Sequence, residues 1–146
     1  MWHRFCQACY NSGMKKFAIV LISLLIGCSD DNRMDVSING EKWNVEIART
    51  AVEQQKGLSG RAKLSPRTGM IFLDDDEHIW TMWMLDTRIP LDMIFFNKDW
   101  IVVHIERGAV PYDLTHISSV YPAIGVLEIN SGEADKVMIG NQIIKN

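Results

Sequence analysis

Apolar and polar residues alternate along much of the chain after residue 33, with the period of two that is typical of half-buried strands. The first two such segments, residues 34–38 and 41–48, are separated by Asn39-Gly40. Asn-Gly is the strongest short signal for a two-residue hairpin turn, because both residues tolerate a positive φ. We therefore expect the domain to open with a β-hairpin.

Further apolar segments, each bounded by turn residues, predict more strands. They are Met70–Leu73, His78–Leu85, Leu91–Phe96, Trp100–Ile105, Gly125–Ile129 and Gln142–Lys145. In the segment 100–105, Ile101, Val103 and Ile105 are expected on one face. The four consecutive acids at 74–77 predict a solvated loop between two strands, and residues 108–119 predict an irregular connection.

Helical signals are few and short. Thr50 and Glu53 have the spacing of a capping box, and Gly57 suits the end of a short helix. Ser131 is expected to cap a single helical turn that reaches Val137. Because strands outnumber helices, the sequence predicts a mainly β fold, with α+β as the alternative. The expected architecture is a small antiparallel β-barrel or sandwich with one or two short helices.

The amino-terminal segment has the features of a secretory signal. Lys15-Lys16 precedes the apolar stretch 17–26, which is short for a membrane span but suits a signal-peptide core. Residues 25–28, Leu-Ile-Gly-Cys, resemble a bacterial lipobox, which implies cleavage before Cys28 and acylation of its thiol. We therefore expect a protein held at the membrane by a lipid anchor, on the periplasmic face of the outer membrane.

This interpretation divides the chain into three parts. Residues 1–27 are a signal peptide, of which 1–13 form an extension upstream of the expected start at Met14. Residues 28–33 are a lipidated tether, and residues 34–146 are one β-rich domain. Cys6 and Cys9 have the C-x-x-C spacing of a redox or metal motif, but cleavage would remove them, so we assign them no role.

The net charge of the chain argues against one class of binding partner. Residues 1–27 contain three basic and no acidic side chains, so the expected mature chain has 12 basic and 18 acidic side chains and a net charge of −6. An acidic chain does not suit nucleic acid, which requires a basic surface. The membrane, a small ligand or an envelope protein remain as expected partners, and no cofactor motif is present in the sequence.

Several motifs resemble the domain-of-unknown-function 192 family. They are Glu53-x-x-x-Gly57-Leu58, Arg61, Gly69-Met70-Ile71-Phe72, Trp83-Met84-x-x-Thr87-x-x-Pro90-Leu91-Asp92-x-x-Phe95 and Val126-Leu127-Glu128-x-x-x-Gly132. The resemblance implies a compact β-rich domain, often exported or lipid-anchored, and supplies no reaction. The chain departs from the family pattern at Leu85-Asp86, where Lys-Asn is usual, and at Asn141, where Asp is usual.

Polar residues inside the apolar stretch 80–96 are the first candidate site, because a polar group in such a setting must find partners. One hypothesis is that Asp92 stabilises the turn 87–91, with Arg61 or Glu128 completing a structural ion pair. The other is a ligand pocket in which Arg61 or Arg88 holds an anion, or a hydrolase that uses this pocket. The candidate residues are Arg61, Trp83, Met84, Asp86, Thr87, Arg88, Asp92 and Glu128.

A second candidate is a copper site. His78, Met82 and Met84 are expected on one face of a strand together with Trp80, with Met70 and Met93 as further thioethers nearby. Thioether and imidazole groups suit Cu(I). The alternative is a core of methionine and tryptophan side chains, which is the commoner arrangement. Neither His104 nor His116 has ligand spacing of its own, and both are interpreted as ordinary.

Overall fold

A β-hairpin opens the part of the chain that the structure, a computed structural model, describes, namely residues 32–146. Strands β1 (Arg33–Ile38) and β2 (Glu41–Ala48) pair antiparallel, and Asn39 and Gly40 join them with φ values of 50° and 81°. The predicted hairpin is therefore confirmed. The expected signal peptide, the lipobox at Cys28 and the Cys6–Cys9 motif lie outside the described residues.

One short helix follows the hairpin. Helix α1 (Ala51–Lys56) has both halves of the predicted capping box, because the Thr50 side chain accepts the Glu53 N–H and the Glu53 carboxylate accepts the Thr50 N–H. It ends at Gly57, where φ is 45°. Along residues 32–146, no helix has the length and apolar character that a membrane crossing requires.

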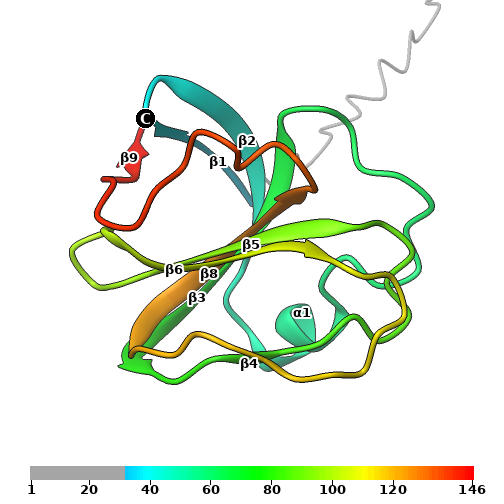
Figure 1. Ribbon diagram of the computed structural model, residues 1–146. Helices are drawn as coiled ribbons and strands as arrows, with labels where there is room; N and C mark the ends of the chain where they lie inside the picture. Colours follow the sequence, from blue (N-terminus) through cyan, green and yellow to red (C-terminus); the bar gives the residue numbers. More distant parts are fainter. Residues whose placement is uncertain (1–31) are drawn as a thin grey trace, which may run out of the picture. The chain divides into compact units, whose positions relative to one another are not determined.

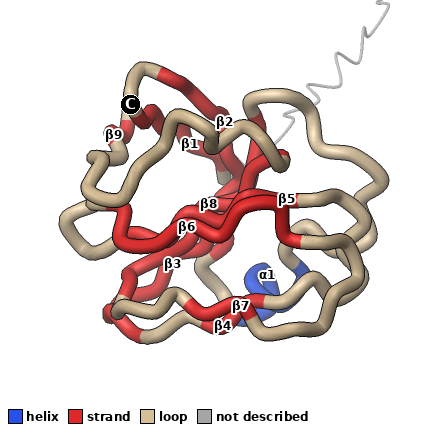
Figure 2. Tube along the Cα trace, viewed as in Figure 1, coloured by secondary structure: helices blue, strands red, loops and turns tan. Residues whose placement is uncertain are grey.

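Seven strands form a curled, half-barrel sheet in the order β6-β5-β8-β3-β2-β1-β9 (Figures 1 and 2). The remaining strands of this sheet are β3 (Thr68–His78), β5 (Leu91–Phe96), β6 (Val102–Ala109), β8 (Ala123–Asn130) and β9 (Ile144–Lys145). All of its pairs are antiparallel except β2 with β3. A separate pair, β4 (Thr81–Met82) with β7 (Ile117–Ser118), makes a small second sheet. The mainly β fold class is confirmed.

Each face of the large sheet packs a hydrophobic core, because successive side chains of a strand point to opposite faces. The first core contains Ile71, Ile94 and Leu127, together with Trp43 from β2. The second contains Met70, Phe72, Met93 and Val126, among others, and is completed by Leu58, Trp80 and Met84 from connecting segments. Helix α1 and the β4–β7 pair lie on the same side of the sheet in Figure 2.

The predicted acidic loop at 74–77 is wrong, because strand β3 continues through it to His78. The ladder to β8 shifts register between Leu73 and His78, and the four acidic side chains are exposed to solvent. Glu77 also accepts the Lys98 N–H at 2.6 Å. An extended strand therefore suits these residues as well as a loop, because their charges stay in water.

The predicted strand at 78–85 is also largely wrong, because only His78, the last residue of β3, and Thr81–Met82 pair as strands. Met84 donates its N–H to the Asp113 carbonyl, and Asp86 adopts a φ of 51° in the turn that follows. The backbone here bonds to a distant loop instead of a continuous ladder, so an apolar pattern alone does not set its conformation.

Two smaller predictions, the shared face of residues 101–105 and the helical turn at 131–137, differ from the structure. The pairing of β5 with β6 shifts register between Phe95 and Phe96. As a result, Val103 packs against the second core and Ile105 against the first, so these two residues do not share a face. Residues 131–136 form consecutive turns instead of a helix, closed by a bond from the Val137 N–H to the Ala134 carbonyl.

Candidate functional site

Asp92 lies on β5 with 1% of its surface exposed, and its carboxylate binds three backbone N–H groups. One oxygen accepts from Gly108 at 2.9 Å, and the other accepts from Gly132 at 2.9 Å and from Ala134 at 3.0 Å. The contacts join β6 to the turns after β8. They do not hold the turn at 87–91, as the sequence suggested. Both oxygens of Asp92 therefore stabilise the fold.

Arg61 forms its ion pair with Glu46 of β2, not with Asp92 or Glu128. Its two Nη atoms lie 2.8 and 2.6 Å from the two Glu46 oxygens, a two-pronged geometry that is among the strongest for this pair. The Arg61 hydrogen bond is the main cause that lowers the Glu46 pKa, with burial opposing it. Arg33 contacts the same carboxylate at 3.1 Å.

The loop 83–88 separates the remaining candidates instead of gathering them into a pocket. Met84 and Thr87 are buried, whereas Trp83, Asp86 and Arg88 are exposed. The Thr87 hydroxyl donates to the Leu85 carbonyl at 3.2 Å, which makes it part of the turn. The loop is tied to its neighbours through its backbone, including a bond from the Gly60 N–H to the Asp86 carbonyl.

Glu128 is a buried acid on β8 that faces the second core. Its register partners are Met70 on β3 and Met93 on β5, so methionine flanks it on both sides. Only 5% of its surface is exposed, and burial raises its pKa to about 8. The carboxyl group is therefore mostly protonated at neutral pH, which reduces the cost of keeping it in an apolar setting.

The residues of the proposed copper site have different environments. Trp80 and Met84 are buried in the second core and Met82 packs against it, whereas His78 is exposed and stacks on Trp80 at 4.8 Å. Within residues 32–146, no three His, Cys, Asp or Glu side chains cluster in a way that would hold a metal ion. The side chains of Trp80, Met82 and Met84 thus pack as core residues.

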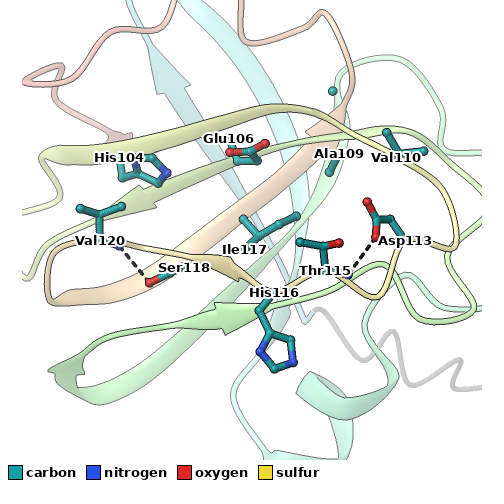
Figure 3. A pocket seen from close by; sticks show the side chains of 11 residues that line it. His104, Glu106, Ala109, Val110, Asp113, Thr115, His116, Ile117, Ser118 and Val120 are labelled. Atoms are coloured by element: carbon teal, nitrogen blue, oxygen red, sulfur yellow. Dashed lines mark hydrogen bonds between the residues drawn. The ribbon is translucent and has the colours of Figure 1, made fainter.

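An open groove of about 420 Å³ lies between β6 and the segment 109–120, which we call the β6 groove (Figure 3). Its apolar lining residues are Ala109, Val110, Ile117 and Val120. Its side chains with hydrogen-bonding groups are His104, Glu106, Asp113, Thr115, His116 and Ser118. In Figure 3, His116 points away from Glu106, and its ring lies 6.0 Å from that of Trp83.

Lining residues on both sides of the groove make defined contacts. On the strand side, His104 stacks on Phe95 at 5.6 Å, and Glu106 is in register with the buried Met93. On the loop side, Asp113 accepts the Thr115 N–H at 2.8 Å, and this bond is the main cause that lowers the Asp113 pKa. Asp113 is therefore ionised at neutral pH.

The sequence did not single out this groove. Its residues are spread over 104–120, in a strand with an unforeseen register shift and a connection predicted as irregular. The available signal was the polar alternation of His104 and Glu106 along one strand, which places both side chains on one face.

The curled sheet with a small second sheet makes a mainly β fold, and the family model for DUF192, "Uncharacterized ACR", matches residues 34–143. The chain therefore belongs to the DUF192 family, as the sequence motifs predicted. No curated protein sequence matches it.

Two solved structures are similar to this chain. A protein of unknown function from Novosphingobium aromaticivorans DSM 12444 is 36% identical with a TM-score of 0.75, covering 91% of this chain and 99% of that one. A protein from Sinorhizobium meliloti 1021, described as a "putative transcription regulator", is 30% identical with a TM-score of 0.72, covering 77% of this chain and 92% of that one.

Proposed function

We propose that the chain is a lipid-anchored protein of the bacterial cell envelope that binds a small ligand in the β6 groove without transforming it. The anchor is supported by the lipobox at residues 25–28. The domain begins with β1 at Arg33, five residues after Cys28, which fits a short tether between an acylated cysteine and a folded module. We place it on the periplasmic face of the outer membrane.

The main observation in favour of ligand binding is that both apolar and polar side chains line the β6 groove. Apolar side chains stand beside polar groups from β6 and from the segment 113–118, and such a mixed lining is usual for a small-molecule site. The lining includes the carboxylates of Glu106 and Asp113 and no lysine or arginine. A neutral or cationic ligand therefore suits the groove better than an anion.

Ligand binding is favoured over a hydrolase centred on Asp92, because both Asp92 oxygens already accept hydrogen bonds within the fold. Both are engaged by the backbone N–H groups of Gly108, Gly132 and Ala134. A carboxylate that acts as general base needs a free oxygen within hydrogen-bonding reach of the proton it takes. Nucleic acid is not proposed as a partner, because the mature chain would have six more acidic than basic side chains.

Native mass spectrometry of the full chain, purified from its own membranes, tests ligand binding. Wild type and the exposed control Asp135→Asn should retain the same additional mass. Glu106→Gln should lose it while keeping the wild-type melting temperature. His104→Ala, which also removes the stacking on Phe95, should lose it while staying folded in a thermal melt. Absence of any retained mass in wild type, or equal retention in the groove variants, would contradict the proposal.

A protein partner is the second candidate, favoured by the apolar surface beside the groove. Trp83, Tyr112 and Leu114 are 48%, 58% and 61% exposed, on two segments joined by the bond from the Met84 N–H to the Asp113 carbonyl. Aromatic residues of this kind are enriched at interfaces. A photoreactive residue at position 83 should give a specific crosslinked species in cells, and one at the exposed Met138 should not.

A further inference from the structure

A row of alternating glutamate and methionine crosses five strands of the large sheet. The register pairs Glu46 with Met70, Met70 with Glu128, Glu128 with Met93, and Met93 with Glu106. Residues paired in register point to the same face of a sheet. Glu128 therefore stands at the centre of the row, with one thioether side chain on each side of it.

The central carboxyl group has no partner of its own in the domain. Glu46, at one end of the row, is paired with Arg61, whereas no hydrogen bond or ion pair to the Glu128 side chain is found within residues 32–146. Glu128 is 5% exposed, and its oxygens keep slight contact with solvent. A buried carboxyl group without a partner is costly, so it indicates either a tolerated cost or a missing cation.

Methionine is concentrated around this carboxyl group. Met70 and Met93 are 7% and 0% exposed, and both belong to the second core, which also contains Met84 and has Met82 packed against it. Four of the six methionines in residues 32–146 thus meet in one core. Thioethers are soft ligands that favour Cu(I) over harder divalent ions.

We propose that Met70 and Met93 bind one Cu(I) ion above Glu128, whose carboxyl group releases its proton to solvent as the ion enters and lies beside the ion as its counter-charge. The sheet geometry permits this arrangement. Neighbouring strands are about 4.8 Å apart, so the Met70 and Met93 backbones stand roughly 10 Å apart across β8. A methionine side chain has three rotatable bonds and adapts its shape readily, which lets both sulfur atoms lean toward the middle of the row.

This site differs from the one predicted on residues 78–84. It replaces the exposed His78 with a carboxyl group, and it takes its sulfur ligands from β3 and β5 instead of from a single strand. None of Met70, Met93 and Glu128 lines the β6 groove, and the site does not depend on the lipid anchor. The slight solvent contact at Glu128 and Met70 offers an ion a route of entry.

Anaerobic competition with a chromogenic Cu(I) chelator tests the proposal on residues 31–146, a compact unit that contains both cores and no cysteine. Wild type should bind one Cu(I) per chain. Met70→Leu and Met93→Leu should each weaken binding at least tenfold, and the double variant should abolish it. Met138→Leu, at a residue that is 62% exposed, is the matched control and should bind as wild type does.

Leucine nearly conserves the volume of methionine, so the variants should stay folded, which thermal melts can verify. If the double variant does not fold, the proposal can be tested on wild type alone. The methionine methyl groups are labelled, and their NMR signals are followed as Ag(I) is added in place of Cu(I). The Met70 and Met93 methyl signals should shift at one equivalent, and the Met138 signal should not. Wild type that binds no Cu(I), a folded double variant that binds normally, or Ag(I) shifts confined to Met138 would overturn the proposal.

Discussion

Arg61 holds Glu46 through two parallel hydrogen bonds of 2.8 and 2.6 Å, which join the loop after α1 to strand β2. Both side chains are about one-third exposed, so water weakens the interaction. A double-mutant cycle of Arg61→Ala and Glu46→Gln, measured by urea denaturation, should give a coupling energy of about 0.5–1 kcal/mol. The corresponding cycle of Arg61 with Asp92 should be additive, and strong coupling there would contradict the observed pairing.

Asp92 should be among the most sensitive polar positions of the domain. Asp92→Asn replaces one carboxylate oxygen with an amide NH₂, which then faces a backbone N–H of Gly108, Gly132 or Ala134. The free energy of unfolding should fall by about 1–3 kcal/mol, the range for leaving a buried donor unsatisfied. Asp135→Asn, at an exposed position, should change it by less than about 0.5 kcal/mol. Equal stability of the two variants in urea denaturation would exclude a structural role for Asp92.

Glu128 should make the metal-free domain less stable as the pH rises. Its pKa is about 8 in the folded chain and near 4.5 in the absence of burial, so between these values the folded state holds a proton that the unfolded state has released. Raising the pH through this window therefore favours unfolding, by up to about 1.4 kcal/mol per pH unit. Glu128→Gln should remove that slope. Stability curves of wild type and variant that stay parallel from pH 5 to 8 would contradict the raised pKa.

Gly125 on β8 has no room for a side chain. A Cβ added there would lie 2.3 Å from the Phe72 carbonyl oxygen and 2.7 Å from the Phe96 ring. Gly125→Ala should therefore lower the free energy of unfolding by more than about 3 kcal/mol, or prevent folding. Gly60→Ala, where φ is 74° and the space is open, should cost only about 1–2 kcal/mol from backbone strain. Similar melting temperatures for the two variants would contradict the packing around β8.

Local signals predicted local structure well. The Asn39-Gly40 turn and the Thr50–Glu53 capping box are set by residues within a few positions of one another, and both are present. The length of β3 and the shortness of β4 depend on pairing with β8 and on bonds to the loop near Asp113, which are distant in sequence. Alternation of apolar residues does not report such contacts.

The candidate site was predicted only in part, for the same reason. The apolar neighbours of Asp92 indicated its burial. Its hydrogen-bond partners, however, lie 16 to 42 residues away and are backbone N–H groups, which the pattern of side chains along the sequence cannot predict. Arg61 was expected to meet an acid, and its partner Glu46 lies on the opening hairpin. The Glu–Met row depends on the register of five strands, which no local sequence pattern reports.

Anchoring through Cys28 decides where the β6 groove would meet its ligand, and intact mass spectrometry of the full chain extracted from bacterial membranes tests it directly. The predicted species begins at Cys28 and carries the added mass of acyl chains, and Cys28→Ser should yield only unprocessed precursor or protein released from the membrane. Wild type found as soluble periplasmic protein without acyl mass would contradict the envelope-anchored function.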